Sequence, residues 1–209
     1  MRTSRGLERF NQFTDGVVAI AITLMVLPLV DTVSDSTQAA DGITHLLGQN
    51  GYQLFSFVLS FLVIARLWLT HQAIFEWVEL YDSRIIWCGF AWMFTIVALP
   101  FTTTLIAEHP QDRLAIGLYI GDMLLSSACL SIITLVIARD PSLRHAEADV
   151  GPDVIAHSII TTSLFAVALA VAVILPQIGL WALFILFFTK PVTTIERNWR
   201  SGTTSTRGL

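Results

Sequence analysis

Six long apolar segments, separated by short charged islands, constrain this chain more than any other feature of its sequence. They lie near residues 11–32, 53–75, 85–106, 114–138, 154–175 and 177–195. About 20 helical residues cross the hydrocarbon core of a bilayer, so each segment can span it as a helix. Of the 209 residues, 54% are hydrophobic and 13% are charged, which leaves too little polar surface for a soluble domain. The sequence predicts an all-α polytopic membrane protein with six transmembrane helices within residues 1–200, followed by a disordered polar tail, 201–209.

The basic residues predict the orientation of this bundle. With six spans, nearly all Lys and Arg residues outside the spans fall on one side of the membrane, and the opposite side has only Arg113. Cytoplasmic loops carry an excess of Lys and Arg, so we expect both termini in the cytoplasm of a multi-pass protein of the cell membrane. The first apolar segment has no small-residue cleavage site, so no removable signal peptide is expected. The residues on the basic side are Arg2, Arg5, Arg9, Arg84, Arg139, Arg144, Lys190, Arg197, Arg200 and Arg207.

Polar groups inside spans are costly and are therefore functional candidates. Arg9 and Asp15 lie near the cytoplasmic end of the first span, nearly two turns apart, so each is expected to seek a partner on another helix. The alternative is a capped helix start with Asp15 in the favourable first turn. Trp68 and His71 lie near the end of the second span, at the same depth as Asp15. We expect Trp68 to be an interfacial anchor and His71 to be a hydrogen-bonded scaffold residue. Arg66, within that span, either extends to the interface or pairs inside the bundle.

One face of the first span carries Ile20, Thr23, Leu24 and Leu27, at positions i, i+3, i+4 and i+7 of a helix. Periodicity alone fits either a packing surface or a pore lining, and packing is the commoner use of such a stripe. Asp31 continues the same face at the outer mouth.

The remaining polar groups favour a transport role over catalysis. Asp122 lies deep in the fourth span, where it serves either a proton- or ion-coupled transporter or a hydrogen bond to neighbouring hydroxyls. Cys88 and Cys129 fall inside apolar segments, as core residues do. The sequence has no metal-ligand spacing, no phosphate-binding glycine loop and no serine-nucleophile elbow. We therefore expect no enzyme activity, no resident metal, no cofactor and no nucleic-acid partner.

The start of the first span resembles a known signature. Residues 9–16 read Arg-x-x-x-Phe-Thr-Asp-Gly, and the transmembrane protein 175 family of potassium channels begins its first helix with Arg-x-x-x-Phe-Ser-Asp. Thr14 stands where serine is usual, which conserves the hydroxyl. Trp68, His71 and the Leu-Pro-Phe-Thr-Thr segment at 99–103 also resemble the family.

The resemblance implies a prokaryotic member with one six-helix repeat, which assembles as a homotetramer in the lipid bilayer. The first helices of the four copies would line a central pore for potassium, the only ion implied. The implied pore-lining residues are the apolar Ile20, Leu24 and Leu27, with Thr23 as a hydroxyl ring. The implied inter-helix network that supports the pore helix consists of Arg9, Phe13, Thr14, Asp15, Trp68 and His71.

The predicted function is a leak-like channel that passes potassium over sodium. A narrow apolar constriction penalises hydrated ions, and potassium loses water at lower cost than sodium. Asp31 would attract cations at the outer mouth. A secondary transporter that uses Asp122 is the first alternative. A membrane enzyme or scaffold is the second, and only the Arg9, Asp15, Trp68 and His71 cluster could form its site.

Overall fold

The computed structural model describes residues 4–30, 50–80, 82–145 and 150–174, and within them the chain is helical. Its long helices are α1 (Ser4–Leu24), α4 (Gly51–Phe75), α5 (Ser83–Glu108), α6 (Arg113–Arg139) and α7 (Pro152–Ile174). All five are long and apolar enough to cross a membrane, which confirms the predicted all-α membrane class. The predicted sixth span, 177–195, the polar tail, 201–209, and Asp31 lie outside the described residues.

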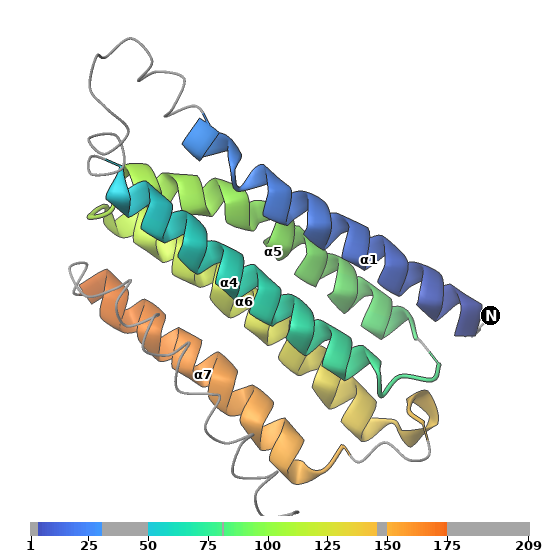
Figure 1. The fold of residues 1–209 in the computed structure, drawn as a ribbon. Helices are drawn as coiled ribbons and strands as arrows, with labels where there is room; N and C mark the ends of the chain where they lie inside the picture. Colours follow the sequence, from blue (N-terminus) through green and yellow to red (C-terminus); the bar gives the residue numbers. More distant parts are fainter. Residues whose placement is uncertain (1–3, 31–49, 81, 146–149, 175–209) are drawn as a thin grey trace, which may run out of the picture.

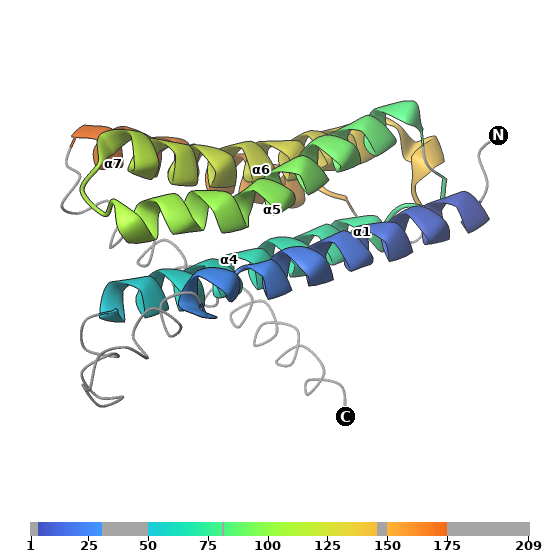
Figure 2. The ribbon, with the colours of Figure 1, turned by 90° about the horizontal axis from the view of Figure 1, so that it is seen from above.

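The helices form two layers. Seen from above, α1 and α4 lie side by side in one layer, and α5, α6 and α7 form the other (Figure 2). The largest interface joins α5 to α6, and α6 also packs along α7. By contrast, α1 lies at one edge of the bundle, on α5 and to a smaller extent on α4 (Figure 1). This edge position leaves one whole side of α1 uncovered by the described part of its own chain.

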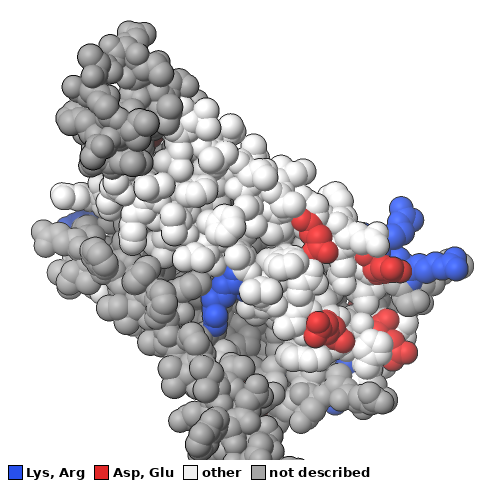
Figure 3. Space-filling model, in the orientation of Figure 1, with Lys and Arg blue, Asp and Glu red and all other residues white. Residues whose placement is uncertain are grey.

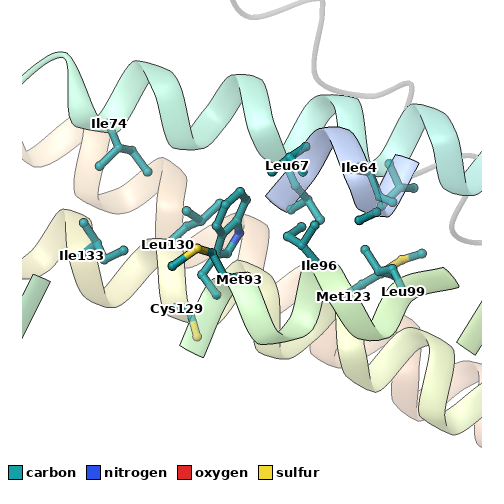
Figure 4. Packing of buried hydrophobic residues seen from close by; sticks show 14 of the residues in the cluster. Ile64, Leu67, Ile74, Met93, Ile96, Leu99, Met123, Cys129, Leu130 and Ile133 are labelled. Carbon is teal, nitrogen blue, oxygen red and sulfur yellow. The ribbon is translucent and has the colours of Figure 1, made fainter. Parts of the chain in front are cut away.

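The core lies where α4, α5 and α6 meet. Figure 4 shows apolar side chains from these three helices pointing toward one another, among them Ile64, Ile96 and Ile133, each 0% exposed. Cys129 is buried among them as predicted, and Cys88 is half-buried. The face shown in Figure 3 is mostly uncharged over the described residues, and acidic side chains gather toward the end where α1 begins. A largely uncharged face is what a membrane-spanning bundle presents to lipid.

Two prolines act differently on their helices. The α1 helix ends at Leu24, and helical structure resumes over residues 27–30. Pro28 lacks an N–H, and its ring crowds the carbonyl four residues earlier, which accounts for the break. In contrast, Pro100 lies inside the continuous helix α5. The hydroxyls of Thr103 and Thr104 donate to the carbonyls of Leu99 and Pro100, 2.7 and 3.0 Å away, within the same helix.

The start of the first helix differs from the sequence-based boundary. The predicted span began at residue 11, whereas α1 begins at Ser4. Hydropathy finds only the part of a helix that lies in hydrocarbon, and the polar first turns of α1 can continue the same helix outside it. The α5 and α6 helices begin at acidic caps instead. The Asp82 carboxylate accepts a hydrogen bond from the N–H of Ser83, and Asp112 accepts two from residues 114 and 115.

Candidate functional site

The two sides of α1 have opposite environments. Its packed side carries Thr14, Val18, Ala21 and Met25, none more than 3% exposed. The outward side carries the apolar residues of the predicted pore stripe. Their side chains remain largely open: Ile20 is 61% exposed, Leu24 44% and Leu27 52%.

Thr23 lies on the outward side of α1 with this stripe. Its side chain is exposed, and its hydroxyl donates to the carbonyl of Ile20, 2.8 Å away. Because this bond uses only the hydroxyl's hydrogen, the oxygen can still accept a hydrogen bond or contact a cation. An exposed hydroxyl next to apolar side chains can interact with a passing polar species.

Asp15 joins α1 to α4. One of its carboxylate oxygens accepts a hydrogen bond from the Trp68 indole N–H at 2.8 Å and another from the Gln72 side-chain amide at 2.6 Å. Hydrogen bonds to an ionised acceptor are among the stronger ones in proteins. Trp68 was on the predicted list of supporting residues, and Gln72 was not. Its i, i+4 spacing from Trp68 is the signal in the sequence that could have indicated it.

Two neighbours of Asp15 face opposite ways. Thr14 is fully buried, donates its hydroxyl to the Phe10 carbonyl at 2.9 Å and lies 3.6 Å from the sulfur of Met93 on α5. A serine hydroxyl could make the same bonds, in agreement with the conserved hydroxyl at this position. Phe13 is 56% exposed on the outward side, and its ring lies against Phe90 at a centroid distance of 6.5 Å.

His71 contributes by stacking. Its ring is fully buried between Phe75 and Trp92, at centroid distances of 4.2 and 4.4 Å. Neither ring nitrogen has a hydrogen-bond partner within the described part of the chain, which differs from the expected hydrogen-bonded scaffold residue. Arg9 is exposed, and among the described residues no ion pair joins it to Asp15. The structure therefore brings Asp15 and Trp68 together, places His71 behind them, and leaves Arg9 at the surface.

A second polar group lies between α4, α5 and α6. The Tyr119 and Ser60 hydroxyls are 2.7 Å apart, and the Thr103 and Ser60 hydroxyls are 2.9 Å apart. Asp122 is half-buried nearby on α6, and Thr102 donates to its carboxylate over a long 3.5 Å. The sequence suggested the neighbouring hydroxyls of Tyr119 and Ser126 on the same span for Asp122, whereas the hydroxyl that reaches it belongs to Thr102 on α5.

Arg66 lines a cavity of about 520 Å³ between α4, α6 and α7, together with Ser131 and His157. This cavity lies away from the outward side of α1. In the part of the chain that the structure describes, no group of three or more His, Cys, Asp and Glu residues could hold a metal ion.

Residues 9–100, which contain α1 from Arg9 onward, match a family model described as the endosomal/lysosomal potassium channel TMEM175. Over these residues the chain is similar to the TMEM175 family, and that model describes a channel. The match includes the Asp15 and Trp68 pair and the outward stripe of α1.

Bacterial potassium channels are among the relatives. A potassium channel of Streptomyces collinus is 33% identical over 104 residues, which cover 50% of this chain and 49% of that protein. A potassium channel of Chamaesiphon minutus is 34% identical over 54% of this chain and 57% of its own. The human endosomal/lysosomal proton channel TMEM175 is 28% identical over 54% of this chain and 22% of its own. The chain thus spans about half the length of the bacterial relatives that it matches.

A solved structure extends the likeness. The crystal structure of a lysosomal potassium-selective channel TMEM175 homolog from Chamaesiphon minutus superposes with a TM-score of 0.72 at 27% identity. The superposition covers 88% of this chain and 95% of that one. The two proteins share a fold over nearly all of the solved chain, well beyond the matched N-terminal half.

Proposed function

We propose that this protein is a leak-like cation channel that passes potassium over sodium, with its pore along the outward side of α1. The observation that carries the proposal is the exposed stripe of Ile20, Leu24 and Leu27 with the exposed hydroxyl of Thr23 beside it. The bacterial relatives named as potassium channels support the permeant ion.

A stripe on one helix cannot enclose a pore, so the proposal requires several copies of the chain around an axis. The family resemblance implies four, a homotetramer with α1 of each copy at the centre. Three apolar rings of four side chains each would narrow and dewet the passage, and an ion would shed part of its water to cross it. The Thr23 hydroxyls would replace part of the lost hydration, which favours the more easily dehydrated potassium ion.

The proposed setting is the cell membrane, with both termini in the cytoplasm, as the basic residues indicate. Asp31, which continues the stripe in the sequence, would then lie at the outer mouth and raise the local cation concentration. We expect Asp31→Asn to lower the potassium conductance at low salt and to have little effect at high salt, where the charge is screened. Single-channel conductance measured across a salt series tests this, and an unchanged low-salt conductance would remove the role of Asp31.

The decisive experiment is single-channel recording of the purified protein in a planar bilayer, with potassium on one side and sodium on the other. Discrete openings with a reversal potential that favours potassium are expected. Ile20→Asn should change both conductance and selectivity, because it places an amide in the apolar ring. Ile160→Asn is the matched control, since Ile160 is 57% exposed on α7 and lies outside the proposed pore. Currents recorded in the same bilayer under a proton gradient would measure proton permeation. The human relative is named as a proton channel.

A secondary transporter is the second candidate, favoured by one observation. Asp122 is a half-buried carboxylate inside a membrane-spanning helix, with a 3.5 Å hydrogen bond from Thr102. On this alternative, vesicles would show saturable uptake driven by a proton gradient, and Asp122→Asn would abolish it. On the channel proposal, unitary currents survive Asp122→Asn. A silent bilayer together with gradient-driven uptake would replace the channel by the transporter.

A further inference from the structure

Among the contacts that hold the first half of α1 against the bundle, two lie on different sides of the helix. Phe10 contacts α5, and Asp15 contacts α4. Five residues at about 100° each separate them by roughly 140° around the helix, and by about 7.5 Å along it. Two contacts separated in this way oppose both rotation and sliding of α1, which neither contact would prevent alone.

The contact with α5 depends on Gly89. A Cβ atom at this position would lie 2.5 Å from Cζ of Phe10 and 3.0 Å from its Cε1, closer than atoms in proteins approach. The Phe10 ring is also enclosed by Phe75, stacked at 6.0 Å, and by Phe90, edge-on at 5.7 Å. The ring therefore has little room to move aside. By comparison, a Cβ at Gly121 on α6 would meet nothing within 4 Å.

The contact with α4 depends on two donors. Gln72 follows Trp68 by one turn, and both donate to the same carboxylate oxygen of Asp15, at 2.6 and 2.8 Å. Two donors from one face of α4 fix the direction of that oxygen more tightly than one donor could. Gln72 also supplies the shorter of the two bonds.

We propose that Gln72 and Gly89 are positioning residues that set the rotation of α1, and so determine that Ile20 rather than Ala21 turns outward. Ile20 is 61% exposed and Ala21 is 2% exposed, although the two differ by a single step of about 100° around the helix. Loss of either contact would allow α1 to turn and would mix packed residues into the outward face. The consequence for permeation rests on the proposed pore, whereas the rotation itself does not.

The test measures which side of α1 faces water in the full-length protein in liposomes. In a background with Cys88→Ala and Cys129→Ala, a single cysteine replaces either Ile20 or Ala21. A trimethylammonium thiosulfonate reagent labels it: the thiolate attacks the reagent's sulfenyl sulfur, a mixed disulfide forms, and sulfinate leaves. With α1 in its native setting, I20C should react fast and A21C slowly. We expect Gln72→Leu to reduce the ratio of the two rates by about tenfold, near the low end of the value of one hydrogen bond to a charged group, and Gly89→Ala to reduce it as well.

Matched controls separate rotation from general loosening. Thr70→Val removes a hydroxyl from α4 that bonds within its own helix, to the carbonyl of Arg66, and Gly121→Ala adds a methyl group to α6 in open space. Both should leave the ratio of rates unchanged. Gln72→Asn and Gly89→Ser serve as second variants if the first ones do not assemble. Phe10→Leu, which is smaller at the clashing ring edge, should restore the ratio in the Gly89→Ala protein.

The outcomes distinguish this inference from the proposed channel. If I20C reacts fast and the ratio of rates stays unchanged in Gln72 and Gly89 variants that assemble normally, the positioning role is wrong and the pore proposal stands. Failure of Phe10→Leu to restore the ratio in the Gly89→Ala protein would also overturn the Gly89 part. If I20C does not react even with Gln72 and Gly89 intact, the outward side of α1 does not face water. The proposed pore then fails, together with the consequence for permeation.

Discussion

The first and fourth described spans, α1 and α6, are almost equally hydrophobic but are used in opposite ways. In the most apolar window of each helix, 22% of α1 is buried within the described chain, against 56% of α6. The hydroxyls of α6 point inward: Ser131 lies 2.7 Å from Ser158 and 2.8 Å from Thr162 on α7. The hydroxyl of Thr23 on α1 is exposed and bonds only its own helix.

This difference shows that hydropathy finds a span without telling what the span faces. In a bilayer, apolar side chains suit lipid and core alike, so the placement of polar groups carries the information. Hydroxyls that pair across helices mark α6 as a scaffold. The exposed hydroxyl of α1 has no such partner helix among the described elements, which fits a face that meets water or ions.

The largest expected effect compares two isoleucines. Ile133 on α6 is 0% exposed and Ile20 on α1 is 61% exposed. Ile133→Ala should cost about 2 kcal/mol, near the low end for buried isoleucine, because detergent solvates the unfolded apolar chain. Ile20→Ala should cost less than about 0.5 kcal/mol. Thermal unfolding in detergent measures both, and equal losses would show that the face of α1 is packed in the assembled protein.

A smaller effect compares two hydroxyls. Ser131→Ala removes an inter-helix hydrogen bond and should destabilise the bundle by about 0.6 kcal/mol, the usual value between membrane helices. Thr23→Val keeps the shape of the side chain and breaks no contact between helices, so the unfolding midpoint should stay constant. Its effect should appear in potassium currents, which fall when the proposed hydroxyl ring is lost. A large loss of stability in Thr23→Val with unaltered currents would contradict the division between the two helices.

Sequence patterns predicted the positions of the helices better than they predicted the contacts between helices. Periodicity could place Ile20, Leu24 and Leu27 on one face, since it depends only on the helix repeat. It could not tell whether that face is packed or open, because openness depends on what α4 and α5 leave uncovered.

The contacts of the site could not be read from spacing. The pairing of Asp15 with Trp68 was expected from the family resemblance, since 53 residues separate the two. The stacking of His71 on Trp92 was missed, because an imidazole suggests hydrogen bonds and the ring that encloses it belongs to another helix. Gly89 gave no signal of its own, since a glycine becomes informative only when the Phe10 ring beside it is known.

The smallest expected effect concerns the start of α6. Backbone N–H groups of Ala115 and Leu114 donate to Asp112 and lower the pKa of its carboxyl below the ordinary value of 3.8. A lowered pKa in the folded state means that the charged cap stabilises α6 above pH 3.8, and that this contribution disappears as the pH falls through the lower, folded value. Asp112→Asn keeps a capping oxygen without a titrating charge. In a pH series of thermal unfolding, the advantage of the native protein over Asp112→Asn should therefore be constant near neutral pH and should shrink in acid. An advantage that grows in acid would mean that the carboxyl is bound in its protonated form, contrary to the two backbone bonds that it accepts.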